Sequence, residues 1–154
     1  MGSYARVGDD QGVKPVRVRS SASEGSPVAS SSLTLLDLHK NWAWFVIIGN
    51  GLAGAWALGA HWYTPLRTRA LWWFTAAAEL TIFVQVTLGV VLVNKEKLEF
   101  PKFHAFYGFV AIMAVAIIYS YRVQMKHRLY LLYGVGGLFI AGLGIRAMLI
   151  GEGR

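Results

Sequence analysis

Four long apolar stretches follow a polar N-terminal segment, and short polar connections separate them. Three of these stretches contain no Asp, Glu, Lys or Arg, and the fourth contains a single charged residue, Glu79. In chain order they cover residues 41–66, 70–94, 103–121 and 129–145. A helix needs about 20 apolar residues to cross a bilayer core, and each stretch reaches that length with its flanks. The pattern predicts an all-α integral membrane protein built as a bundle of four transmembrane helices.

The predicted helices form one transmembrane domain over residues 32–154. Pro101 suits the first position of the third helix, because an N–H group in the first turn has no partner within the helix. In the first helix, Gly51, Ala55 and Gly59 form a row of small residues that lets a neighbouring helix approach closely. The four helices are expected at residues 33–62, 70–94, 101–125 and 129–150.

Residues 1–31 are predicted to form a disordered polar tail. The segment is rich in Gly, Ser and charged residues and has few large apolar side chains. Such a composition buries too little apolar surface to offset the conformational entropy lost on ordering. We favour a solvated tail over an arm that docks on a partner.

Composition narrows the classes of function. Charged residues make up 15% of the chain, against about 25% in soluble domains. The net charge of +7 comes largely from basic residues beside the apolar stretches, where lipid phosphates are available, so it does not indicate nucleic-acid binding. The chain has no Cys, which excludes disulfides, iron–sulfur clusters and covalently attached c-type haem.

Two histidines are predicted to face each other across the bundle. His39 and His104 each lie near the start of a helix, and the first and third helices of such a bundle run in the same direction. The two side chains therefore lie at similar depth on one side of the membrane. Iron in a b-type haem takes one axial nitrogen on each face of the macrocycle, and bundle cores commonly hold such cofactors. The alternative is that both histidines are interfacial anchors bonded to headgroups or water.

Small residues accompany both candidate ligands. Ala43 follows His39 by four positions and Gly108 follows His104 by four, so each shares a helix face with its histidine. Gln85 and Gly89 form a similar pair on the second helix. A flat macrocycle needs small neighbours, and these four residues are therefore candidates for the cofactor site.

The other two histidines are predicted to lie outside the apolar core. His61 and His127 are separated from His39 and His104 by about 33–35 Å of helix. That length exceeds the roughly 30 Å thickness of the hydrocarbon core, so both pairs cannot be inside it. His127 stands between Lys126 and Arg128, which indicates a solvated position.

Glu79 is the ionisable residue predicted to lie deepest in the membrane, and Asn50 falls at similar depth. An unpaired charge there costs several kcal/mol, so the position is a functional candidate. We favour a protonated Glu79 that is hydrogen-bonded to Asn50 or to a backbone carbonyl. A proton-relay role is the alternative.

The segments DLHKNWAWF, FVQVTLGVVLV and FHAFYGFVAI resemble one half-bundle of haem A synthase, over about residues 35 to 115. The resemblance implies that His39 and His104 bind haem on the outer side of a bacterial plasma membrane. The family has two half-bundles where this chain has room for one. It also has a Glu before the first ligand, where this chain has Leu36 or Asp37. Haem A synthesis itself is therefore not implied, whereas a single half can still hold haem b.

These observations predict a membrane protein with one bis-histidine haem b, active in one-electron transfer to or from quinone or a respiratory complex. The alternative is a cofactor-free accessory subunit of a larger membrane complex. The basic connections on one side favour both termini outside, by the positive-inside rule. No reaction is assigned from the sequence.

Overall fold

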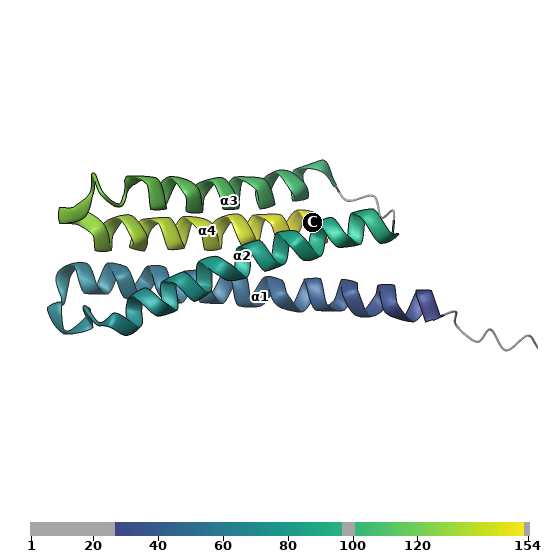
Figure 1. The fold of residues 1–154 in the computed structure, drawn as a ribbon, viewed down its shortest axis with the longest axis horizontal. Coiled ribbons are helices and arrows are strands. Elements are labelled where there is room, and N and C mark those ends of the chain that lie inside the picture. The colour runs from purple at the N-terminus through teal and green to yellow at the C-terminus, as the bar shows by residue number, and fades with distance from the viewer. Residues whose placement is uncertain (1–26, 97–100, 153–154) are drawn as a thin grey trace, which may run out of the picture.

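A computed structural model describes residues 27–96 and 101–152 and shows a bundle of four long helices (Figure 1). All four are long and apolar enough to span a membrane, and the chain is an integral membrane protein. Short 3₁₀ turns, η1 (Thr64–Leu66) and η2 (Lys126–Arg128), precede the second and fourth helices. The helices are α1 (Pro27–Trp62), α2 (Arg69–Glu96), α3 (Lys102–Tyr121) and α4 (Leu129–Gly151).

The helix bounds differ from the predicted ranges at two places. α1 begins at Pro27, so residues 27–31 belong to this helix and not to a disordered tail. Proline is favoured in a first turn, and lengthening an existing helix costs little compared with nucleating one. α3 ends at Tyr121, before the predicted residue 125, and a turn follows it. Residues 1–26 of the predicted tail lie outside the described residues.

The helices pack as a bundle in which α2 and α3 make few contacts with each other. α1 lies against α2 and α4, and α3 lies against α4. α2 crosses the bundle obliquely and approaches α3 near the start of α3 (Figure 1). A Cβ atom at Gly108 of α3 would lie 3.7 Å from Val86 Cγ2 of α2, which marks this contact. At their other ends, α2 and α3 diverge.

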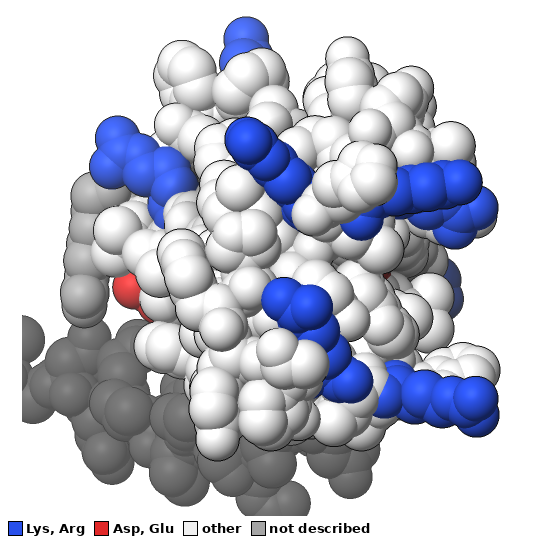
Figure 2. Space-filling model, turned by 90° about the vertical axis from the view of Figure 1, so that its left-hand side faces the viewer, with Lys and Arg blue, Asp and Glu red and all other residues white. Residues whose placement is uncertain are grey.

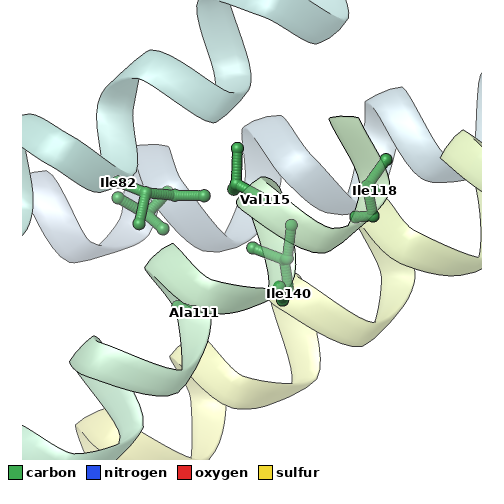
Figure 3. Packing of buried hydrophobic residues seen from close by; sticks show 7 residues of the cluster. Ile82, Ala111, Val115, Ile118 and Ile140 are labelled. Atoms are coloured by element: carbon green, nitrogen blue, oxygen red, sulfur yellow. The ribbon is translucent and has the colours of Figure 1, made fainter. Parts of the chain in front are cut away.

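Side chains from all four helices form the apolar core. Ile82 of α2, Val115 of α3 and Ile140 of α4 point toward one another in its centre (Figure 3). Val46 of α1 completes the cluster with the small side chains of α3. This core holds the helices in the register that places the side chains at either end of the bundle.

The closest helix contact joins α1 to α4 through glycines. A Cβ atom at Gly54 would lie 2.7 Å from the Leu138 nitrogen and 2.8 Å from the Gly134 oxygen. The predicted small row is therefore only partly right. Gly51 does face α4, but Ala55 is exposed. The seam on α1 runs through Gly51, Gly54 and Leu58 instead.

The two ends of the bundle differ in charge. α1 and α3 begin at one end, which we call the histidine end because it holds His39 and His104. η1 and η2 lie at the other, which we call the basic end. Figure 2 shows Lys and Arg side chains gathered over the basic end. The connections there contain Arg67, Arg69, Arg122, Lys126 and Arg128.

Candidate functional site

The imidazole rings of His39 and His104 lie close together at the histidine end. Their ring centres are 5.9 Å apart and the ring planes are inclined by 60°. His39 is buried, with 6% of its surface exposed, and His104 is half-buried in the first turn of α3. The sequence predicted that these two side chains share one level of the bundle, and the structure places them there. α1 and α3 meet through this pair although their main packing partner is α4.

The ring of His104 is oriented by α4. His104 Nδ1 lies 2.9 Å from the carbonyl oxygen of Ala147. A carbonyl oxygen only accepts hydrogen bonds, so His104 Nδ1 is the donor. Histidines that bind metals usually have this second hydrogen bond, which fixes both tautomer and ring orientation. Gly151 packs beside the same ring, since a Cβ atom there would lie 2.8 Å from Nδ1.

Gln85 of α2 holds His39. Its Nε2 atom lies 3.2 Å from His39 Nε2 and 3.1 Å from the His39 carbonyl oxygen. An amide nitrogen only donates, so His39 Nε2 is the acceptor and the ring is neutral. The lone pair that accepts this hydrogen bond is the one an iron ion would use. Gln85 and iron would therefore compete for the same nitrogen.

The small residues have different surroundings. A Cβ atom at Gly89 would lie 3.3 Å from His39 Cε1, so this glycine borders the candidate ligand. Gly108 instead faces Val86, and its small size allows α2 to approach α3. Ala43 is half-buried one turn beyond His39. Of the small residues predicted beside the ligands, Gly89 has the closest contact with an imidazole.

His61 and His127 lie at the basic end, far from the His39–His104 pair. The His61 ring packs edge-on against Trp62, with ring centres 5.1 Å apart, and His127 is exposed in η2. Arg67 donates to the His61 carbonyl oxygen over 2.9 Å. This is the interfacial placement that helix length predicts for them.

The predicted hydrogen bond between Glu79 and Asn50 is absent from the described residues. Asn50 Nδ2 donates instead to the carbonyl oxygens of Val46, at 2.9 Å, and Ala78, at 3.0 Å. Ala78 precedes Glu79, and successive side chains on a helix diverge by about 100°. The carboxyl group of Glu79 is thereby turned away from Asn50, toward a recess between α2 and α3.

The donor set fits a haem better than a bare metal ion. No group of three or more His, Cys, Asp or Glu side chains in the described part of the chain is placed to hold a metal. A haem supplies the equatorial ligands itself and needs two axial nitrogens. Metal–imidazole bonds of about 2 Å put the centres of two opposed rings about 6 Å apart. The observed centres are 5.9 Å apart, but the rings are inclined by 60° and His39 Nε2 is directed at Gln85, so this nitrogen would have to leave Gln85 to bind iron. Gln85 Oε1 is buried with no hydrogen-bond donor among the described residues.

Sequence reasoning missed the contribution of α4. Neither Ala147, which orients His104 through its backbone, nor Gly151, which makes room for the ring, has a side chain that signals a site. The glycine content of α4 indicated close packing but not the partner.

No family model, no curated protein and no solved structure matches this chain.

Proposed function

We propose that this protein binds one b-type haem between His39 and His104 and transfers single electrons within the membrane. The observation that carries the proposal is the 5.9 Å separation of the two rings, presented by helices that run in the same direction. The hydrogen bond from His104 to Ala147 supports it, because it fixes the orientation of the ring, as second hydrogen bonds do for metal-binding histidines.

Each residue of the site would have a separate role in holding the haem. His39 and His104 would each supply an axial nitrogen, and a haem so held supplies a reversible one-electron change at its iron. The Ala147 carbonyl orients the His104 ring. Gly89 keeps the surroundings of His39 free of a larger side chain. A haem held by both histidines would serve electron transfer rather than chemistry on a bound substrate.

A visible spectrum tests this proposal. Protein purified from haem-replete cells should show a Soret band and, after dithionite reduction, the sharp α-band of six-coordinate haem b. A pyridine haemochrome assay should give one haem per chain. Colourless protein from the same cells would contradict the proposal.

A second proposal, a cofactor-free accessory subunit of a larger membrane complex, rests on one face of α3. Its side chains are large, apolar and exposed along several turns, and an adjacent subunit would cover them as well as lipid does. The stripe consists of Phe103, Phe106, Phe109, Met113 and Ile117. Colourless protein that migrates with a larger complex in native gels would support this proposal over haem binding.

We further propose that the basic end faces the cytoplasm of a bacterium and that both termini lie outside its plasma membrane. The gathering of Lys and Arg at the basic end supports this orientation (Figure 2). The chain has no Cys, so single cysteines report topology without interference. In intact cells, an impermeant maleimide should label Lys102→Cys and spare Thr68→Cys. The reverse pattern would contradict the orientation.

A further inference from the structure

A recess of about 490 Å³ opens between α2 and α3 at the basic end. Its volume lies within the range of about 300–1,000 Å³ that is usual for small-molecule sites. Its walls come from α2, the end of α3, η2 and the start of α4. It lies where α2 and α3 diverge, so a molecule dissolved in the bilayer can reach it sideways. No residue of the His39–His104 site lines it.

Glu79 gives the recess an unusual inner wall. It lies about 15 Å along α2 from Arg69, well inside the predicted hydrocarbon region. Its side chain has no ion pair and no hydrogen bond among the described residues, since Asn50 bonds elsewhere. An ionisable group at this depth is costly to keep without a partner. A ligand in the recess would supply that partner.

Aromatic and basic side chains form the rest of the recess. The Trp72 and Tyr133 rings meet edge to face, with centres 5.3 Å apart. The Arg122 guanidinium lies over the ring of Tyr119, 3.7 Å from its centre. Both aromatic pairs line the recess, and Lys126 lies with Arg122 at its outer part. The site thus offers flat apolar walls, a carboxyl group at the inner side and cations at the outer side.

We propose that this recess binds the ring of a lipid-soluble quinone or its quinol, with the apolar tail passing between α2 and α3 into the bilayer. A quinone ring is flat and carries oxygens on opposite edges. One oxygen would meet Glu79 and the other would meet the donors Arg122, Lys126 or the tyrosine hydroxyls. A phospholipid fits less well, because its phosphate would use the cations but its acyl chain would leave Glu79 facing hydrocarbon.

The proposal names the redox partner of the proposed haem protein and rests on that function for its electron transfer, but not for binding. Reduction of a quinone to a quinol takes up two electrons and two protons. The electrons would pass one at a time through the haem, which a one-electron donor protein outside this chain would re-reduce between the two steps. Glu79 would give up one proton from its carboxyl group and regain it from water, and water at the outer side of the recess would supply the other.

Binding is tested without haem in the His39→Ala, His104→Ala double variant and in the wild-type protein, both in phosphatidylcholine nanodiscs. The probe is an azido-quinone photolabel, with decylubiquinone as competitor. Cross-links should map to segments 72–79 and 119–133, and decylubiquinone should abolish them. Glu79→Leu should weaken decylubiquinone binding about tenfold, as expected for one lost hydrogen bond in an apolar site. Arg122→Gln should weaken it several-fold.

Matched variants outside the recess serve as controls. Thr87→Leu on α2 and Arg128→Gln at the basic end should leave the affinity unchanged. Equal affinity in Glu79→Leu and wild type, or cross-links outside the two segments, would overturn the proposal. Phospholipid retained in native mass spectra and lost in Arg122→Gln, with no photolabelling, would show that the recess binds lipid instead. Quinone binding by a protein that never acquires haem would refute the proposed function and leave this inference standing.

Discussion

The histidine end and the basic end of the bundle differ in whether their buried polar side chains are hydrogen-bonded within the protein. At the histidine end the polar groups fix one another, since Gln85 holds His39 and Ala147 orients His104. At the basic end Glu79 lines an open recess, and among the described residues it has no ion pair and no side-chain hydrogen bond. The first arrangement fixes both imidazole rings, with His39 Nε2 accepting a hydrogen bond from Gln85. The second leaves a polar group exposed to the recess, where the proposed quinone would bind reversibly.

The glycine seam between α1 and α4 supports both ends and should show the largest effect. Gly54→Leu drives a side chain into the backbone of Gly134 and Leu138, so we expect the free energy of unfolding to fall by more than about 3 kcal/mol. Gly142→Leu is the matched control, because no atom lies within 4 Å of a Cβ atom there. Unfolding by SDS titration measures both. Equal stability of the two variants would contradict the seam.

The sequence predicts the length, direction and depth of the helices, but not the rotation of each helix about its own axis. The runs without charge predict the four helices, because bilayer thickness sets their length. Helix direction and depth predict that His39 and His104 share one level. The rotation of each helix about its axis is not predicted, since almost every face is apolar. For this reason the pattern does not identify Gly54 as the seam, and it offers Glu79 either Asn50 or a backbone carbonyl as partner, whereas Asn50 bonds to Val46 and Ala78.

The next largest effect is expected for Gly151 of α4, which packs beside the His104 ring. In Gly151→Leu the new side chain collides with the His104 ring, which must move and lose its hydrogen bond to Ala147. Loss of such an orienting contact typically weakens metal binding 10–100-fold, and we expect haem affinity to fall by about tenfold. Haem titration of the apoprotein measures it, with Gly142→Leu as the reference. An unchanged affinity would mean that α4 does not orient the ligand.

The smallest expected effects are the stability changes caused by replacing one polar side chain at each end. Glu79→Leu removes an unpartnered polar group, so we expect stability to rise by about 1 kcal/mol. Gln85→Leu removes two hydrogen bonds to His39, so we expect stability to fall by about 1–2 kcal/mol. SDS titration of both apoproteins gives the two values. A loss of stability in Glu79→Leu would show that Glu79 is a structural residue and that the contrast between the ends is wrong.

The most direct test of the haem proposal is the dithionite-reduced spectrum of four histidine variants. His39→Ala and His104→Ala should each lose the sharp α-band or become high-spin, because one axial position opens. His61→Ala and His127→Ala should keep the band, because both residues lie at the basic end. An intact band in the His39→Ala, His104→Ala double variant would show that the haem is held elsewhere.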